Sequence, residues 1–179
     1  QRAETNDAAG AIEDFTAALQ IDPDLADAYS GRAYARASLG DATGAIADFT
    51  EALRRRPSAA DAYLGRAYAQ ASLGNTAAAT EDFTQALALN PRLADAYSGR
   101  AYARASLGDA TGAVADFTQA LALVPDDPDS LLGRGYAWAT LGDTASAAAD
   151  MERAAALFAA RGQAQRASEA LGALRDLGE

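Results

Sequence analysis

Apolar residues recur at helical spacing along the chain, and the helical segments themselves recur with a period of 34 residues. Ala45, Phe49, Ala52 and Leu53 are spaced so that their side chains share one face of a helix. The phenylalanine of this face returns every 34 residues, in the series Phe15, Phe49, Phe83 and Phe117, with Met151 next. The pattern predicts a tandem array of similar helical units.

Each unit is expected to hold two helices joined by a tight turn. The first helix runs from about Ala26 to Leu39 and ends at Gly40, because glycine readily adopts the left-handed conformation that terminates helices. Asp41 then caps the second helix. The same capping position holds Asp7, Asn75, Asp109 and Asp143 in the other units. Helices this short are unstable alone, so packing between neighbouring units must stabilise them.

A unit of 34 residues with small, aromatic and proline residues at these positions resembles the tetratricopeptide repeat. The family signature is present as Tyr29, Ala33, Gly40, Ala45, Phe49, Ala52 and Pro57, then as Tyr63, Ala67, Gly74, Ala79, Phe83, Ala86 and Pro91, then as Tyr97, Ala101, Gly108, Ala113, Phe117, Ala120 and Pro125. A fourth copy drifts, with Leu131, Gly135, Gly142, Ala147, Met151, Ala154 and, in place of proline, Ala159. Arg36 and Arg104 stand where the family usually has an aromatic residue. The resemblance implies an all-α, right-handed superhelical solenoid of antiparallel helix pairs.

The repeat phase divides a single tetratricopeptide array over residues 1–179. It predicts a partial repeat over 1–23 that holds only a second helix, repeats over 24–57, 58–91 and 92–125, a divergent repeat over 126–161 and a capping helix within 162–179. Without proline at Ala159, the last second helix is expected to continue to about Ala160. Because natural arrays end in polar caps, the partial first repeat suggests an array cut from a longer protein.

Composition narrows the chemistry that the chain can perform. There are 15 Lys+Arg against 25 Asp+Glu, a net charge of −10, with no histidine and no cysteine. Nucleic acid is an unsuitable ligand for such a chain, because phosphate binding needs a cationic face. Imidazole and thiolate chemistry are excluded, and no titratable groups converge in the sequence, so we expect no enzyme, no catalytic residues, no metal and no cofactor. No apolar run approaches the roughly 20 residues of a membrane span.

One stripe on each first helix is the candidate ligand-binding surface. The resemblance implies that first helices line the concave groove of the array. Asp27, Gly31, Tyr34 and Ser38 share a narrow arc of the first helix, opposite its core-facing residues. The equivalent positions are Asp61, Gly65, Tyr68 and Ser72, then Asp95, Gly99, Tyr102 and Ser106, then Asp129, Gly133, Tyr136 and Thr140.

Each residue type in this stripe also has a structural interpretation. A glycine inside a helix costs about 1 kcal/mol relative to alanine, and it either permits close helix packing or leaves a notch for a ligand side chain. The tyrosines either pack against the next repeat with exposed hydroxyls or form an aromatic ladder. The aspartates either complement the helix dipole or make the groove acidic.

A second recurring pair is interpreted as structural. Arg32 lies at the edge of the apolar face of its helix, and Asp48 lies at the edge of the next. The pair recurs as Arg66 with Asp82, Arg100 with Asp116 and Arg134 with Asp150. A charge-assisted contact between the two helices of each repeat is therefore predicted.

The leading functional hypothesis is a non-catalytic scaffold that binds a peptide or partner protein in an acidic, tyrosine-lined groove. The partner is expected to be neutral or basic, because Asp, Gly and Tyr replace the Lys, Arg and Asn with which relatives grip a terminal carboxylate. The alternative is a structural module that forms head-to-tail homo-oligomers through its repeat ends. The compartment stays open: cytoplasmic is the default, and periplasmic or secreted placement follows if an N-terminal segment has been removed. The arginine-only basic residues and abundant alanine suggest a bacterial origin.

Overall fold

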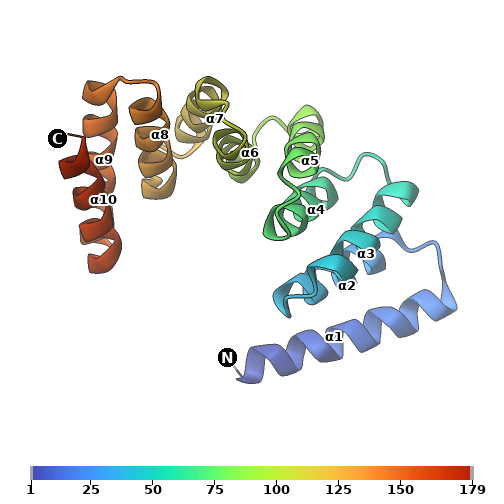
Figure 1. Cartoon of the computed structure of the whole chain (residues 1–179). Helices are drawn as coiled ribbons and strands as arrows, with labels where there is room; N and C mark the ends of the chain where they lie inside the picture. The colour runs from blue at the N-terminus through green and yellow to red at the C-terminus, as the bar shows by residue number, and fades with distance from the viewer. Residues whose placement is uncertain (1, 178–179) are drawn as a thin grey trace. The chain divides into compact units, whose positions relative to one another are not determined.

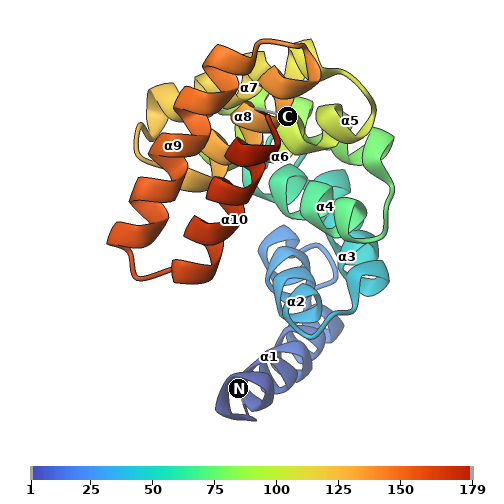
Figure 2. The same ribbon diagram turned by 60° about the vertical axis from the view of Figure 1, so that its left-hand side comes forward.

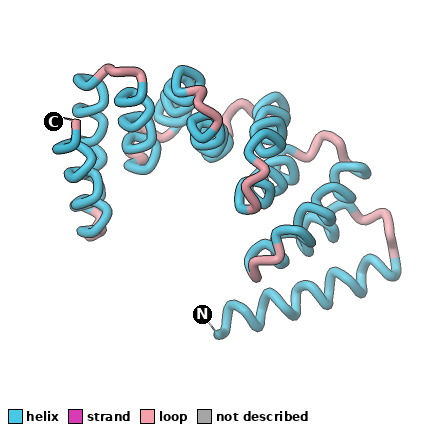
Figure 3. The backbone as a smooth tube through the Cα atoms, viewed as in Figure 1, coloured by secondary structure: helices cyan, strands magenta, loops and turns pink. Residues whose placement is uncertain are grey.

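The computed structural model describes residues 2–177, with side chains from residue 7 onward. Within these residues the chain forms ten helices and no strand, which confirms the predicted all-α class (Figure 1, Figure 3). The helices are α1 (Arg2–Ile21), α2 (Ala26–Ser38), α3 (Ala42–Arg55), α4 (Ala60–Ser72), α5 (Thr76–Leu89), α6 (Ala94–Ser106), α7 (Ala110–Leu123), α8 (Pro128–Thr140), α9 (Thr144–Ala160) and α10 (Ala164–Asp176). The first residue of the predicted partial repeat and the last two of the predicted cap lie outside this range.

The helices group into two compact units, residues 1–91 and 92–179. In the first unit α1 packs on α2 of the pair α2–α3, and α3 packs on α4 of the pair α4–α5. In the second unit the pair α6–α7 packs on the pair α8–α9, and α10 packs against α9. The helices of each pair lie side by side and run in opposite directions (Figure 2). Each unit thus contains two helix pairs and one additional helix.

The turn inside each pair has the predicted geometry. Gly40 has φ +83°, and the backbone N–H of Asp41 donates to the carbonyl of Arg36 at 2.9 Å. The Asp41 carboxylate accepts a hydrogen bond from the N–H of Gly44 at 2.8 Å and so caps α3. Positive φ recurs at Gly74, Gly108, Gly142 and Gly162. The local sequence therefore dictates where each first helix ends and each second helix begins.

Two predicted caps differ from this arrangement. Asp7 lies inside α1, which runs from Arg2 to Ile21 without interruption, so the predicted cap at this position is wrong. The signal that should have stopped the helix is missing, because Asn6 stands where the other units have glycine. Asn75 precedes α5, but its side chain accepts no capping hydrogen bond.

The core of each pair consists of small residues around one aromatic side chain. In α2 and α3, Ala33, Ala45 and Phe49 are completely buried. They form a cluster with Leu53 and with Ala62 of the next pair. Small residues let the helix backbones approach closely, while the phenylalanine fills the space between consecutive pairs. This packing fixes the face of each first helix that stays exposed.

Candidate functional site

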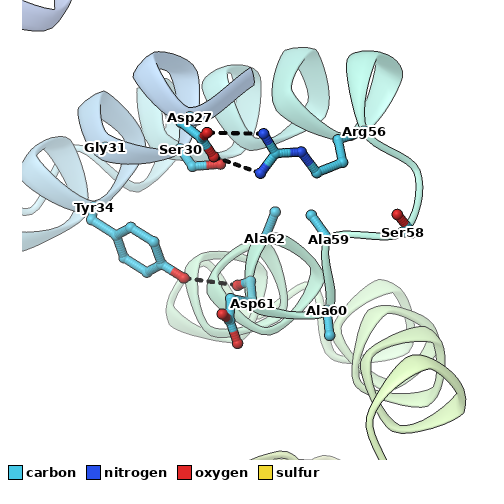
Figure 4. A pocket seen from close by; sticks show the side chains of 10 residues that line it. All are labelled: Asp27, Ser30, Gly31, Tyr34, Arg56, Ser58, Ala59, Ala60, Asp61 and Ala62. Carbon is cyan, nitrogen blue, oxygen red and sulfur yellow. Dashed lines mark hydrogen bonds and ion pairs between the residues drawn. The ribbon is translucent and has the colours of Figure 1, made fainter. Parts of the chain in front are cut away.

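The predicted stripe of the first unit surrounds a pocket between α2 and α4. Asp27, Gly31 and Tyr34 of α2 line it together with Asp61 of α4 (Figure 4). Its volume is about 520 Å³, and Arg56, Ser30 and Ser58 add polar groups to its wall. Consecutive first helices thus bring their stripe residues together, as their common phase in the repeat requires.

Arg56 changes the charge of this pocket. Its guanidinium donates two hydrogen bonds to the Asp27 carboxylate, from Nη1 to Oδ1 at 2.6 Å and from Nη2 to Oδ2 at 2.9 Å (Figure 4). These bonds lower the pKa of Asp27 below its ordinary value of 3.8. The acidity predicted from Asp27 is therefore offset by a residue that the repeat pattern did not single out. Arg56 lies in the linker after the second helix, where only this repeat has an arginine.

Tyr34 separates this pocket from a second one. Its hydroxyl donates a 2.8 Å hydrogen bond to the backbone carbonyl of Asp61, and its ring meets Phe49 edge-on with centroids 4.9 Å apart. Burial, with the nearby charge of Asp61, raises the pKa of Tyr34. The ring is still 47% exposed. The tyrosine therefore packs against the next repeat, which favours the first of its two interpretations, but its hydroxyl is bonded to protein rather than exposed.

The second pocket is predominantly apolar. Tyr34 and Tyr68 flank it, Phe49 forms its base, and Leu73 lies at its end. The predicted stripe residues Gly65 and Ser72 also line this space of about 520 Å³. Two pockets of similar size and different polarity thus lie on either side of one tyrosine.

The stripe glycines lie directly beneath phenylalanine rings. A Cβ built on Gly65 would lie 2.3 Å from Cζ of Phe49, and one built on Gly31 would lie 2.3 Å from Cζ of Phe15. Gly133 has the same relation to Phe117, at 2.4 Å. The space beside each of these glycines is filled by the second helix of the preceding pair, which favours the packing interpretation over an empty notch.

The second unit repeats this arrangement on α6 and α8. The Tyr102 hydroxyl donates to the backbone carbonyl of Asp129 at 2.8 Å, and its ring lies edge-on to Phe117. Burial, reinforced by the charges of Asp129 and Asp127, raises the pKa of Tyr102 to about 12. Arg166 of α10 is bonded to the Asp129 carboxylate through both terminal nitrogens. Asp129, like Asp27, is therefore neutralised by an arginine from elsewhere in its unit.

The remaining stripe residues lie as follows. Tyr136 lines a further pocket with α10. Asp95 and Gly99 lie on α6, where Asp95 is exposed in the first turn. The last stripe position points its hydroxyl at its own helix, as Ser38 to the carbonyl of Ala35, Ser72 to that of Ala69, Ser106 to that of Tyr102 and Thr140 to that of Tyr136.

The predicted arginine–aspartate pairs are confirmed. Arg32 donates from Nε and Nη2 to the buried Asp48 carboxylate at 2.8 and 2.7 Å, and its Nη1 reaches Thr16 Oγ1 of the preceding helix. Arg66 with Asp82, Arg100 with Asp116 and Arg134 with Asp150 make the same two bonds. Each arginine joins the two helices of its own pair, and Arg66 and Arg134 likewise reach the preceding second helix, through Thr50 and Thr118.

The arginines at the family's aromatic position belong to the same network. Arg36 forms a 2.8 Å ion pair with Asp48, and Arg104 forms one with Asp116 at the same distance. In the repeat between them Gln70 donates to Asp82 at 2.9 Å. A second donor to the buried carboxylate thus replaces aromatic packing at this position.

A comparison with protein-family models matches the tetratricopeptide repeat over residues 2–60, 30–94, 72–128 and 98–164. The chain belongs to the tetratricopeptide repeat family. Such repeats are generally non-catalytic modules for interaction with other proteins. A comparison with curated protein sequences gives no match.

Solved tetratricopeptide structures resemble this chain in fold. A crystal structure of MamA matches with a TM-score of 0.83 at 21% identity, over 88% of this chain and 92% of that chain. YrrB, described as a TPR protein with an unusual peptide-binding site, matches with a TM-score of 0.68 at 21% identity, over 91% of each chain. The first TPR of Spaghetti (RPAP3), bound to the HSP90 peptide SRMEEVD, matches with a TM-score of 0.64 at 26% identity, over 65% of this chain and 93% of that chain.

Among residues 2–177, this tetratricopeptide array has no helix long and apolar enough to cross a membrane. The same residues contain no group of three or more acidic side chains placed to hold a metal ion. The candidate binding surface consists of the two pockets beside Tyr34 and the pocket beside Tyr136.

Proposed function

We propose that the first unit binds an extended peptide across Tyr34, with one side chain in the apolar pocket and a polar one in the pocket beside Asp61. The observation that carries this proposal is the pair of adjacent pockets that share Tyr34. The tyrosine is held rigidly by its hydrogen bond to Asp61 and its edge-on contact with Phe49. A preformed aromatic surface loses little entropy on binding, which favours recognition of a flexible peptide.

The charge of the partner follows from the pocket walls. Asp27 and Asp61 face one cation, Arg56, which is already engaged in two hydrogen bonds to Asp27. The carboxylate of Asp61 makes no ion pair with the described side chains, so a net negative charge is left at the polar pocket. A neutral or basic peptide suits this surface better than an acidic one.

A peptide selection would test this proposal. Random dodecapeptides selected on the purified chain are expected to bind in the micromolar range, on the order of −8 kcal/mol. Ala37→Glu, at the rim of the apolar pocket, should abolish binding of the selected peptides. Ala47→Glu, the same change on the exposed face of α3, should leave it intact. Equal binding by both variants would place the peptide elsewhere and refute the proposal.

A second candidate function is supported by α1. This helix matches the second helices of the repeats, yet it packs only on α2, and the described residues contain no first helix on its other side. Ala11 and Ala18 are partly exposed, whereas Ala45 and Ala52 at the matching positions are 0% and 1% exposed. Partly exposed apolar residues on this face of α1 favour head-to-tail association with a second copy.

Light scattering over a range of concentrations would test the self-association hypothesis. If α1 is the contact, the mass should rise with concentration for the wild type and for Ala17→Arg, on the exposed face of α1. Ala18→Arg, on the partly exposed apolar face, should remain monomeric. A wild-type chain that is monomeric throughout would rule out this function.

A further inference from the structure

The pocket beside Tyr136 in the second unit differs from the candidate sites of the first unit. It has a volume of about 450 Å³ and lies between α8, α9 and α10. Tyr136, Ala139 and Met151 form one side, at the positions that Tyr34, Ala37 and Phe49 occupy in the apolar pocket of the first unit. The construction is therefore the same, but the opposite wall comes from the capping helix rather than from a repeat.

The capping helix makes this wall acidic. Glu169 and Asp176 of α10 line the pocket together with Gly172, Ala173 and Leu177. In the first unit the corresponding end of the pocket carries Ser72 and Leu73 and no carboxylate. A helix expected from sequence only to cover the end of the array thus supplies both charges of a pocket.

The two carboxylates that line this pocket have no basic residue among the other residues that line it. Glu169 accepts a 3.2 Å hydrogen bond from the uncharged Gln165. No arginine lines the pocket; Arg175 of the same helix lies beside it, with its Nη2 3.9 Å from the position of a Cβ at Gly172. Arg166 of α10 is bonded to Asp129 and also attracts Glu169 electrostatically. When Arg166 and its partner Asp129 are counted with Glu169, Asp176 and Arg175, three carboxylates and two guanidinium groups leave this region negative, in a chain whose net charge is −10.

We infer that this pocket binds a basic side chain of a partner protein, a lysine or an arginine whose aliphatic stem lies on Tyr136, Met151 and Leu177 and whose charge lies between Glu169 and Asp176. Long basic side chains bury an apolar stem while their charged end stays at a polar rim, and this pocket offers both surfaces. The half-exposed Tyr136 ring adds a face that attracts cations. The inference rests on the proposed function, because it names the class of residue that a bound partner must present to the second unit.

A side-chain series measured on the whole chain would test the inference. The probes are pentapeptides Ac-Ala-Ala-Xaa-Ala-Ala-NH2 in which Xaa is lysine, norleucine or glutamate, titrated while backbone amide chemical shifts are followed by NMR. Norleucine keeps the stem of lysine and lacks its charge. The lysine peptide should shift the amides of Gly172 and Leu177 and bind more tightly than the norleucine peptide. The glutamate peptide should be the weakest.

Three single substitutions and one control test whether charges at the pocket change the affinity for the lysine peptide. Glu169→Gln and Asp176→Asn should each weaken the lysine peptide by about two- to fivefold, the effect of one exposed charge pair, and leave the norleucine peptide unchanged. Arg175→Gln should strengthen lysine binding. Glu152→Gln, on the exposed face of α9, is the matched control and should have no effect.

The outcomes separate this inference from the proposed function. If norleucine binds at Gly172 as tightly as lysine, the pocket is apolar in its preference and the inference is wrong, while peptide binding by the array stands. If lysine binding is indifferent to Glu169→Gln, Asp176→Asn and Arg175→Gln, the inference is equally wrong. If neither peptide shifts Gly172 while the selected dodecapeptides still shift Leu73 in the first unit, the inference fails and the proposed function stands; if the dodecapeptides also leave Leu73 unshifted, both fail.

Discussion

The ring of Phe49 lies against the Cα of Gly65, so close that a methyl group at residue 65 would be 2.3 Å from the ring atom Cζ. Phe49 itself is completely buried. This contact joins the second helix of one repeat to the first helix of the next. The position of the glycine inside a helix is thereby explained by packing between repeats.

Gly65→Ala should therefore lower stability. Overpacking costs about 1–3 kcal/mol, which outweighs the gain of about 1 kcal/mol that alanine brings to a helix. Gly10→Ala is the matched control, since a Cβ at Gly10 meets nothing within 4 Å, and it should raise stability by up to about 1 kcal/mol. Urea denaturation monitored by circular dichroism measures both. If Gly65→Ala also stabilises the chain, the ring is free to move and the glycine serves another purpose.

The buried Asp82 should be more important for stability than its exposed neighbour Glu81. Asp82 accepts two hydrogen bonds from Arg66 and one from Gln70. Asp82→Asn should lower the free energy of unfolding by roughly 2–4 kcal/mol, because the guanidinium then lacks a charged partner while the amide keeps one acceptor. Glu81→Gln should change it by less than about 0.5 kcal/mol. Similar effects for both substitutions would show that the ion pair does not stabilise the repeat.

The hydroxyl of Tyr34 is expected to contribute a small part of the stability. Tyr34→Phe removes the hydrogen bond to the carbonyl of Asp61 and should cost about 0.5–1.5 kcal/mol. Tyr136→Phe provides the comparison, because the Tyr136 hydroxyl makes no hydrogen bond to the described residues and its loss should be nearly neutral. Thermal denaturation of the two variants checks the difference. A larger loss for Tyr136→Phe would contradict it.

Alkaline pH should destabilise the chain through its tyrosines. The pKa of Tyr102 rises from 10.0 to about 12 on folding, because burial and nearby carboxylates disfavour the tyrosinate. A pKa raised in the folded state means that the folded chain holds this proton more firmly than the unfolded one. The stabilisation is fully present below pH 10.0 and is lost as the pH rises toward about 12. Unfolding measured between these values should show the decline, and Tyr102→Phe should reduce it.

Much of this architecture could be predicted from sequence because it depends on local chemistry. Gly40 and Asp41 fix the turn between two helices by backbone conformation and capping, which act over a few residues. The pairing of Arg32 with Asp48 could also be inferred, because both recur in every repeat at the edge of an apolar helix face. The end of α9 at Ala160 followed from the missing proline. In each case the residues of a single 34-residue repeat were enough for the prediction.

The properties of the candidate site could be predicted only in part. The stripe of Asp27, Gly31 and Tyr34 was found from its phase on the helix, and the structure gathers these residues around one pocket. The sequence predicts an acidic groove but not the arginine that offsets Asp27, because Arg56 lies 29 residues away, in a linker outside the repeat pattern. The two carboxylates that α10 adds to the pocket beside Tyr136 could not be predicted either, since Glu169 and Asp176 belong to no repeat.

The sequence by itself determined the helices, their turns and the repeat phase, since helix propensity, capping and apolar periodicity act within each 34-residue unit. Only the tertiary structure decided that the phenylalanine of one pair occupies the space over the next glycine and that the tyrosine hydroxyl bonds to the next helix. The tertiary structure also decided which stripe aspartates are paired with an arginine, as Asp27 is with Arg56 and Asp129 is with Arg166. These outcomes depend on distances between atoms of different repeats, and such distances follow from how helices pack and not from the order of residues within one helix.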